Sequence, residues 1–155
     1  MDEETRRRLR FRRQFLITND REAAPLPGWR ELDIAPYRLF HHPDLEAHPG
    51  SAAGRTTVLL GNIYDAGDPE KTDAEIAQEL ARTASLAEMV RRTDSCCGSF
   101  VMLRLAEGRL QLAHDAWSLR EVYYRSAEHF HCASTPDLIA AYVHCERRQE
   151  EEVSQ

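Results

Sequence analysis

Short apolar runs separated by turn residues predict a series of β-strands in the first 64 residues. We expect strands over 14–19, 29–34, 37–42 and 56–64. The last of these has a continuous apolar centre, which indicates burial on both faces of a sheet. Residues 43–55 are rich in proline, glycine and small side chains, so we predict a mobile loop between the third and fourth strands.

Two helices are predicted after Lys71, each by a capping motif at its start. In Thr72-Asp73-Ala74-Glu75, the threonine hydroxyl and the glutamate carboxylate can each accept a hydrogen bond from a backbone N–H of the first turn. Ser85-Leu86-Ala87-Glu88 repeats this arrangement. Apolar residues at helical spacing follow both motifs: Ile76, Ala77, Leu80 and Ala81 in the first helix, and Leu86, Met89 and Val90 in the second.

The register of one hairpin follows from its turn. Glu107-Gly108 suits a two-residue turn, because glycine accepts a positive φ without a Cβ clash. Folding the chain there makes three pairs on one face: Leu105 with Leu110, Leu103 with Leu112, and Val101 with His114. This aliphatic face must be buried. The opposite face is also partly apolar, with Phe100, Met102 and Ala113. We therefore expect a sheet that is covered on both faces in a multilayer fold.

Residues 110–134 are predicted to form three consecutive strands, and a helix follows them. Ser134 or Thr135 caps this helix, with Pro136 at its first position. Its buried side is expected to hold Leu138, Ile139, Tyr142 and Cys145. We divide the chain into an arginine-rich arm (1–13), one folded domain (14–145) and a charged tail (146–155).

Composition narrows the class of protein. The chain of 155 residues is 42% hydrophobic and 30% charged, which is typical of a single globular domain. No apolar run approaches the roughly 18 residues that span a bilayer. The N-terminal arginines are not followed by the apolar segment of a secretory signal. We therefore expect a cytoplasmic protein without a membrane partner.

Charge and cysteine content refine this expectation. A net charge of −6 argues against nucleic-acid binding. The alternative is binding through the arm, which holds Arg6, Arg7, Arg8, Arg10, Arg12 and Arg13. The four cysteines lack CxxC spacing, and we expect free and mostly buried thiols at Cys96, Cys97, Cys132 and Cys145.

Four segments carry motifs that occur together, in the same order, in one enzyme family. Residues 60–65 are L-G-N-I-Y-D, where the family has N-G-E-I-Y-N, and residues 97–101 are C-G-S-F-V, where it has D-G-x-F-A. Residues 114–124 match R-D-x-x-G-x-x-P-L-Y-Y without a gap, and 132–134, C-A-S, stand where the family has F-A-S. Over 15–142 the chain thus resembles the N-terminal glutaminase domain of asparagine synthetases, a class II glutamine amidotransferase.

The resemblance implies an α+β fold of the Ntn-hydrolase type, a four-layer αββα sandwich of two antiparallel sheets between helices. The family's nucleophile is an N-terminal cysteine, whose own α-amino group serves as the base. Here the chain begins with Met1 and Asp2, and the arm precedes the first strand. Leu60 stands where the family has an asparagine that donates to the oxyanion, and losing one such donor costs on the order of a hundredfold in rate. We therefore predict no glutaminase activity.

The remaining family positions are candidates for binding: Gly61, Asn62 and Asp115. The resemblance implies that the N–H of Gly61 is the second oxyanion donor. No arginine could be matched to the family's binder of the glutamine carboxylate. For Asp115 we expect a structural role, in which its carboxylate accepts backbone N–H bonds from the turn 116–119. Trp117, Tyr123 and Tyr124 are expected in the core rather than around a ligand.

Two further sets of side chains could carry chemistry. Cys97 or Cys96 could act as a nucleophile if His114 lay within hydrogen-bond reach; the alternative is that both cysteines are small buried residues at a helix–strand junction. His129 and His131 lie two apart on a strand and could begin a metal site, with His144 or Cys145 as further ligands. We expect neither catalysis nor a metal at these positions. His41, His42 and His48 flank the predicted loop and are weaker metal candidates.

The sequence lacks the S-G-G-x-D-S pyrophosphate loop of the synthetase domain and the G-x-x-x-x-G-K-[ST] phosphate loop, so we expect no cofactor. By resemblance, the function is that of a non-catalytic glutaminase-like domain that scaffolds or regulates an ATP-dependent amide-forming synthetase. The partner would be a synthetase domain in the same protein, a separate synthetase subunit, or a second copy of the chain. The alternative is an active hydrolase or amidotransferase that uses Cys97 or Cys96.

Overall fold

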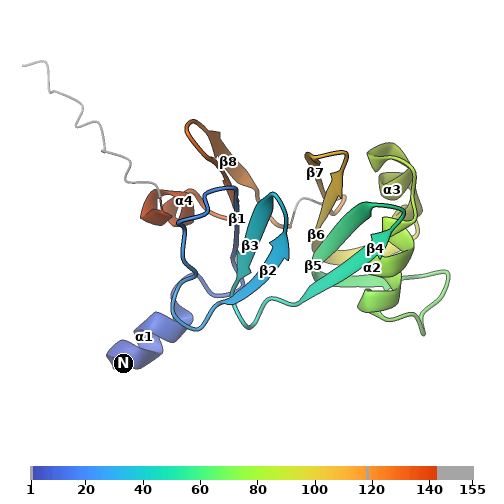
Figure 1. Cartoon of the computed structure of the whole chain (residues 1–155). Helices are drawn as coiled ribbons and strands as arrows, with labels where there is room; N and C mark the ends of the chain where they lie inside the picture. Colours follow the sequence, from blue (N-terminus) through green and yellow to red (C-terminus); the bar gives the residue numbers. More distant parts are fainter. Residues whose placement is uncertain (1, 118, 143–155) are drawn as a thin grey trace, which may run out of the picture.

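The protein folds into two antiparallel sheets that lie face to face, with helices on their outer sides (Figure 1). The computed structural model describes residues 2–117 and 119–142. One sheet has five strands: β1 (Phe15–Thr18), β2 (Arg30–Ile34), β3 (Tyr37–His41), β8 (Tyr123–Ser126) and β9 (Phe130–Ala133). The other has four: β4 (Ala47–Ala52), β5 (Arg55–Asp65), β6 (Cys96–Ala106) and β7 (Arg109–His114). The helices are α1 (Glu3–Leu9), α2 (Asp73–Ala81), α3 (Leu86–Arg92) and α4 (Pro136–Tyr142).

The strand order is β2-β3-β1-β9-β8 in the five-stranded sheet and β4-β5-β6-β7 in the four-stranded sheet. The prediction of an α+β fold with two antiparallel sheets is confirmed. So is the register of the β6–β7 hairpin, which pairs Leu105 with Leu110, Leu103 with Leu112, and Val101 with His114. Glu107 and Gly108 form its turn with φ of 53° and 72°, as a two-residue hairpin turn requires.

The main core lies between the two sheets. The five-stranded sheet contributes Phe15, Ile17 and Leu39, and the four-stranded sheet contributes Val58, Leu60, Val101 and Leu103. All seven side chains are at most 1% exposed. Leu112 packs against this core from β7 and is only partly buried, because β7 is an edge strand.

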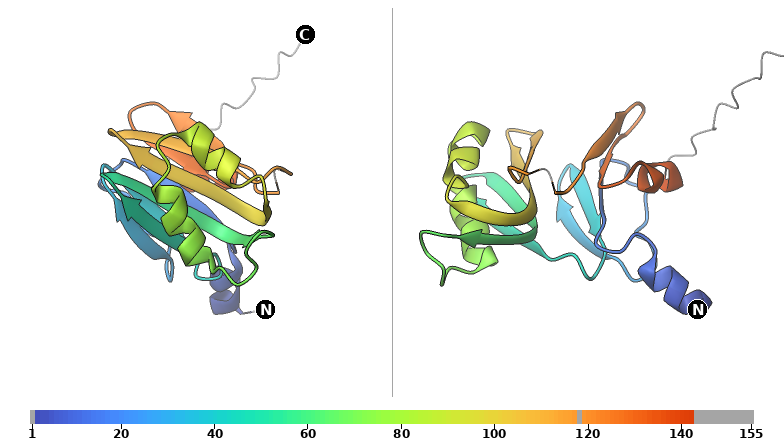
Figure 2. Two further views of the ribbon diagram at one scale, coloured as in Figure 1. Left: turned by 90° about the vertical axis from the view of Figure 1, so that its right-hand side faces the viewer. Right: turned by 180° about the vertical axis from the view of Figure 1, so that it is seen from behind.

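Helices form the two outer layers (Figure 2). On the four-stranded sheet, α2 and α3 cover a second core that includes Leu59, Ile63, Phe100 and Met102. On the five-stranded sheet, Leu138 and Ile139 of α4 pack against β-strand residues of a third core. Burial on both faces explains the continuous apolar centre of β5, since its alternate side chains enter different cores.

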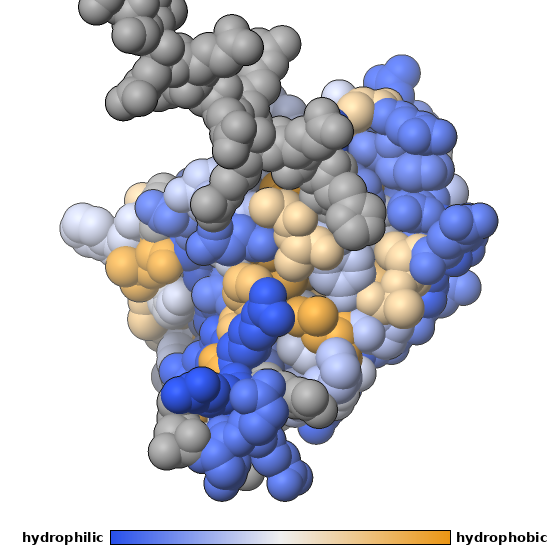
Figure 3. Space-filling view, turned by 90° about the vertical axis from the view of Figure 1, so that its left-hand side faces the viewer, coloured by the Kyte–Doolittle hydropathy of each residue, from blue (hydrophilic) through white to orange (hydrophobic). Residues whose placement is uncertain are grey.

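The outer face of the five-stranded sheet is covered by one short helix and by loop residues. Figure 3 shows hydrophobic residues gathered in the middle of this face, with hydrophilic residues around them. The partly buried hydrophobic residues packed against its core are Phe11, Ala23, Leu26, Trp29 and Tyr142. The loop 20–28 therefore supplies part of the cover that a second helix supplies on the other side.

The predicted mobile loop over 43–55 is wrong, because Ala47–Ala52 in this segment form strand β4. Its proline and glycine have structural roles in an edge strand. Pro49 lacks an N–H, which an edge strand tolerates. A Cβ added to Gly50 would lie 2.5 Å from the carbonyl oxygen of Ala77, so only glycine lets α2 lie this close to β4. In the sequence alone, the proline and glycine of this strand could not be told apart from the proline and glycine of a loop.

The capping motifs begin both helices as predicted. Thr72 and Glu75 form the reciprocal capping box of α2. At α3 the Ser85 hydroxyl accepts from the N–H of Glu88, but the Glu88 carboxylate accepts from the N–H of Ala84, one residue earlier than a capping box requires. Of the predicted stripe on α3, Met89 is buried and Val90 is 41% exposed, so the position of Val90 in the core is corrected.

The arm forms helix α1, with Asp2 as its N-cap, and then turns back toward the domain. The Arg12 guanidinium lies 2.6 Å from the Asp44 carboxylate and ties the end of the arm to the β3–β4 connection. The tail 146–155 lies outside the described residues, as do His144 and Cys145. Among the described residues, no helix has the length and apolarity needed to cross a membrane.

Candidate functional site

The chain crosses between the two sheets at the β3–β4 connection and again at the β7–β8 connection, and a pocket of about 290 Å³ lies there. Its walls come from five separate parts of the chain, including Arg13, two residues before β1, and one residue each from β5 and β6. The lining residues are Arg13, Asp44, Leu45, Glu46, Asn62, Ser99 and Arg120. We call this the crossover pocket.

Strand alternation places Asn62 and Ser99 in the crossover pocket. Asn62 lies two residues after Leu60, so it projects from the same face of β5 as that core residue. Ser99 is its register partner on β6. The face that is apolar between the sheets thus becomes polar where the sandwich ends, and Asn62, a position implied by the resemblance, is exposed there.

Gly61 is required by close packing beside the pocket. Its φ is +99°, and a Cβ at this position would overlap the Ser99 carbonyl oxygen and would lie 3.0 Å from Arg120 Nε. The N–H of Gly61 donates to the carbonyl oxygen of Glu46 at 2.9 Å. This donor is therefore engaged within the protein, whereas the resemblance implies that it faces an oxyanion.

Arg120 is the residue that sequence reasoning missed. Its Nε donates to the Ser99 carbonyl at 3.3 Å, and its Nη1 donates to the Arg13 carbonyl at 3.2 Å. Burial lowers the pKa of the Arg120 guanidinium; the charge of Arg13 adds to this effect and Asp115 opposes it. The only sequence signal was an arginine that closes the turn after Asp115, and no local pattern says what such a residue reaches.

Asp115 holds this turn in place, as predicted. It is 3% exposed, and its Oδ1 accepts from the N–H groups of Trp117 and Leu119, both at 3.1 Å. The turn delivers Arg120 to the crossover pocket. Asp115 is therefore a positioning residue beside the pocket rather than part of its lining.

Charges of both signs surround the crossover pocket. Arg13 and Arg120 are the basic residues of its lining, and Asp44 and Glu46 are the acidic ones. The Glu46 carboxylate itself lies 3.3 Å from His48 Nε2. The hydrogen bond from Arg12 keeps the pKa of the Asp44 carboxyl below its usual value. None of the lining residues is a cysteine, so this pocket offers polar binding groups and no thiol nucleophile.

The cysteines of β6 line a different pocket, of about 210 Å³, which also contains His114, Asp115 and Trp117. The structure thus brings Cys96, Cys97 and His114 to one cavity. Burial, and after it the charge of Asp65, raises the pKa of the Cys96 thiol, which is the opposite of activation. Cys96 Sγ donates to the Arg92 carbonyl at 3.9 Å, and His114 Nδ1 lies 3.1 Å from the Asp115 carbonyl oxygen.

The expectation of buried thiols holds in part. Cys132 is buried between the sheets, and burial raises its thiol pKa to about 12. Cys97 is exposed, so its prediction as a small buried residue is wrong. Of the thiols in the described residues, Cys97 is therefore the one open to reagents.

His129 and His131 lie together, as their spacing predicted, with ring centroids 6.5 Å apart. His131 is 5% exposed, and His129 Nε2 lies 4.0 Å from Asp20 Oδ1. The proposed further ligands, His144 and Cys145, lie outside the described residues. Within the ranges 2–117 and 119–142, the group that brings three possible ligand atoms within 4.8 Å of one another lies elsewhere, at Glu46, His48 and Asp73.

The predicted aromatic core after β7 is wrong. Trp117 is 84% exposed, Tyr124 75% and Tyr123 37%. Trp117 lies in the turn that Asp115 holds at the surface, and β8 is an edge strand of the five-stranded sheet. Leu119, in the same segment, is 64% exposed. The segment 117–124 therefore presents large apolar side chains to solvent.

Comparison of the chain with models of known protein families finds no match. Searches among characterised proteins and among solved structures also find none. Evidence for function therefore comes from the crossover pocket, the cysteine-lined pocket, the exposed segment 117–124 and the sequence motifs.

Proposed function

We propose that this chain is a non-catalytic glutaminase-like domain that scaffolds or regulates an ATP-dependent amide-forming synthetase, in the same protein or as a separate subunit. The observation that carries the proposal is the crossover pocket. It lies beside the start of β1, and its lining includes Arg13, Arg120 and two acidic residues but no cysteine. We also propose that the fold is of the Ntn-hydrolase type.

The layer order supports the fold assignment. Two antiparallel sheets lie between helices, as the resemblance implies. The two motif segments 60–65 and 97–101 are register partners on β5 and β6, with Asn62 opposite Ser99. Motifs that are distant in sequence therefore meet at one pocket, which is the arrangement expected of an active-site remnant.

The loss of catalysis rests on the groups that surround this pocket. Arg13 lies two residues before β1, and its carbonyl accepts a hydrogen bond from Arg120. The Leu60 side chain is buried in the core between the sheets, so it cannot stabilise an oxyanion. With the Gly61 N–H bonded to Glu46, neither oxyanion donor implied by the resemblance is available.

A partner surface is supported by the exposed segment 117–124. Trp117, Leu119 and Tyr124 are each more than 60% exposed, although large apolar side chains in solvent are costly. Exposed apolar groups of this kind mark interaction surfaces, and aromatic anchors contribute most to binding. We assign this surface to the synthetase partner.

The test is direct binding. A tagged chain is recovered from its native cells, and the amide-forming synthetase recovered with it is purified and titrated against the wild-type protein. The double variant Trp117→Ala/Leu119→Ala is expected to bind roughly tenfold more weakly or worse. Arg109→Ala, an exposed change at the start of β7, is the matched control and is expected to bind normally. Recovery of no synthetase, or equal binding by both variants, contradicts the proposal.

The alternative function, a hydrolase that uses Cys97, is favoured by one observation: Cys97 and His114 line the same pocket. A thiol-reactivity titration separates the two functions. For a non-catalytic protein, Cys97 is expected to react with a thiol reagent no faster than the cysteine of an unfolded peptide does. A much faster reaction that slows in His114→Ala would support the hydrolase instead.

A further inference from the structure

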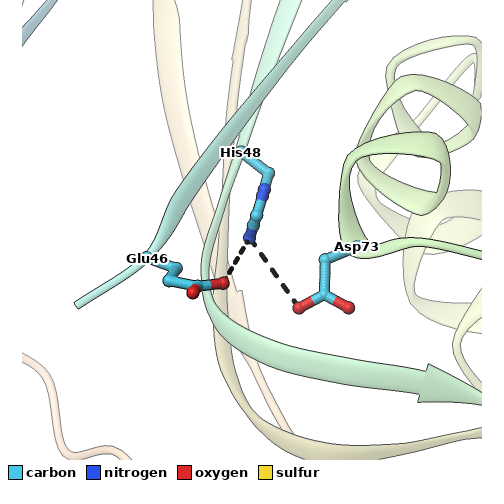
Figure 4. Close-up of side chains that lie close together, drawn as sticks. All are labelled: Glu46, His48 and Asp73. Atoms are coloured by element: carbon cyan, nitrogen blue, oxygen red, sulfur yellow. Dashed lines mark ion pairs between the residues drawn. The ribbon is translucent and has the colours of Figure 1, made fainter. Parts of the chain in front are cut away.

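Three side chains that can ligate a metal converge between β4 and the start of α2 (Figure 4). His48 Nε2 lies 3.3 Å from Glu46 Oε2 and 3.8 Å from Asp73 Oδ2. The three ligand atoms all lie within 4.8 Å of one another. The set therefore combines one imidazole with two carboxylates from segments that are distant in the sequence.

The alternation of side chains along a strand places Glu46 and His48 on the same face of the sheet. Glu46 directly precedes β4, and His48 follows two residues later on the same face. The register partner of His48 is Leu59, which belongs to the core under α2, so His48 projects toward the helix layer. The Glu46 carbonyl accepts the N–H of Gly61 at 2.9 Å, which fixes the backbone next to His48.

Helix α2 supplies the third ligand. Asp73 is the first residue of α2, directly after the Thr72 N-cap whose capping box sets the start of the helix. Gly50 lets this helix lie against the backbone of β4, which brings Asp73 close to His48. His48 and Asp73 therefore lie in a strand and a helix, and Glu46 lies next to β4, where its carbonyl accepts the N–H of Gly61.

The electrostatics of the cluster call for a cation. His48 Nε2 is fully buried and makes no hydrogen bond among the described residues, although it points between two carboxylates. Lys71 pairs with Asp65, Asp68 and Glu79 rather than with this cluster. A divalent ion would give the imidazole nitrogen a partner and would balance the charge of Glu46 and Asp73.

We propose that Glu46, His48 and Asp73 form a binding site for a divalent transition-metal ion, with water completing its coordination. Metal–ligand bonds of about 2.0–2.2 Å in a tetrahedron put ligand atoms roughly 3.3–3.6 Å apart. The His48–Glu46 distance already fits, and Asp73 needs to approach His48 by only a few tenths of an ångström. An imidazole ligand favours zinc, cobalt or nickel over magnesium and calcium.

The site is open on one side and joins two layers of the fold. The Glu46 side chain is 65% exposed, so an ion and its water ligands can reach the cluster from solvent. A bound ion would link the edge strand β4 to the first turn of α2 and would stabilise the folded protein. This inference does not depend on the proposed function.

The test is titration of the metal-free full-length protein with Zn²⁺ by calorimetry, with Mg²⁺ in a parallel run. We expect one saturable Zn²⁺ site, no comparable Mg²⁺ site and a rise in melting temperature with Zn²⁺. His48→Gln should weaken binding at least roughly tenfold. His129→Gln, a histidine outside the cluster, is the matched control and should bind as the wild type does.

Two further measurements keep the result unambiguous. Glu46→Gln changes a mostly exposed side chain and carries the same expectation if His48→Gln fails to fold. Because exposed Cys97 could bind zinc, the titration is repeated in Cys97→Ala, and a Co²⁺ spectrum should lack a thiolate charge-transfer band. Absence of saturable binding, or equal binding by the cluster variants and the control, would overturn the proposal.

Discussion

At the scale of single residues, the chain is shaped by contacts that only certain side chains can make. Gly61, Asp115 and Arg120 illustrate this around the crossover pocket. Gly61 leaves room for the Ser99 carbonyl and for Arg120, and Asp115 holds the turn that delivers Arg120. The motif around Gly61 was visible in the sequence, but the reason for the glycine was not, because its neighbours come from β6 and the β7–β8 connection.

Replacement of Gly61 by alanine should be more harmful than the same change at Gly54. Both glycines have positive φ, +99° and +73°, but only Gly61 has atoms within 4 Å of the added Cβ. We expect Gly54→Ala to cost about 1 kcal/mol through backbone conformation alone. Gly61→Ala adds a steric overlap and should cost roughly 2–5 kcal/mol. Urea unfolding of both variants measures the difference, and equal losses would show that the close approach at Gly61 is wrong.

Because of His131, we expect the folded protein to become less stable as the pH falls. Burial lowers its pKa from the ordinary value of 6.5, with His129 and Arg125 adding to the effect and Asp20 opposing it. Since the unfolded chain then takes up the proton first as the pH falls, the stability that the neutral ring permits is full above about pH 6.5. It is lost as the pH falls from there through the folded-state pKa.

The check is urea unfolding at about pH 7.5 and about pH 5.5. The wild type should be less stable at the lower pH, and His131→Gln should show a smaller decrease. This variant removes no hydrogen bond of Nδ1, which has none among the described residues. A decrease that is unchanged in His131→Gln would mean that other groups cause the acid sensitivity.

At the scale of helices and strands, local signals predicted most of what the structure contains. The β6–β7 register and the α2 capping box depend on residues close in sequence, and both were predicted. Strand β4 was missed because Pro49 and Gly50 are loop signals. Their true reasons, an unpaired strand edge and the close approach of α2, are tertiary. Trp117 and Tyr124 were wrongly placed in the core because hydrophobicity alone does not tell a core residue from an interface residue.

The burial of the β6–β7 hairpin allows the effect of two leucine substitutions on stability to be predicted. Leu103 is 1% exposed between the sheets, whereas Leu112, its register partner, is only partly buried. Leu103→Ala should therefore cost about 2–5 kcal/mol, since it removes buried methyl groups and leaves a cavity. Leu112→Ala should cost less, because part of its side chain already contacts water.

Urea or thermal unfolding of the two leucine variants tests the layer model. The expected order is Leu103→Ala less stable than Leu112→Ala, and both less stable than the wild type. A loss of less than about 1 kcal/mol for Leu103→Ala would mean that this face of the hairpin is not enclosed between two sheets.

At the scale of the whole molecule, two antiparallel sheets lie face to face between helices. The crossover pocket is lined by basic and acidic residues and by no cysteine, and the exposed thiol, Cys97, lies in a second pocket. Exposed apolar residues beside these pockets suit a protein that acts through a partner.

Measurement of ammonia release from glutamine tests whether the protein lacks glutaminase activity. The purified wild-type protein is incubated with glutamine beside the Cys97→Ala variant and a protein-free control. We expect release by the wild type to equal release by both controls, since Leu60 has no donor group and the Gly61 N–H is bonded to the Glu46 carbonyl. Sustained release by the wild type that disappears in correctly folded Cys97→Ala would show that the protein is an active glutaminase and would contradict the proposed non-catalytic function.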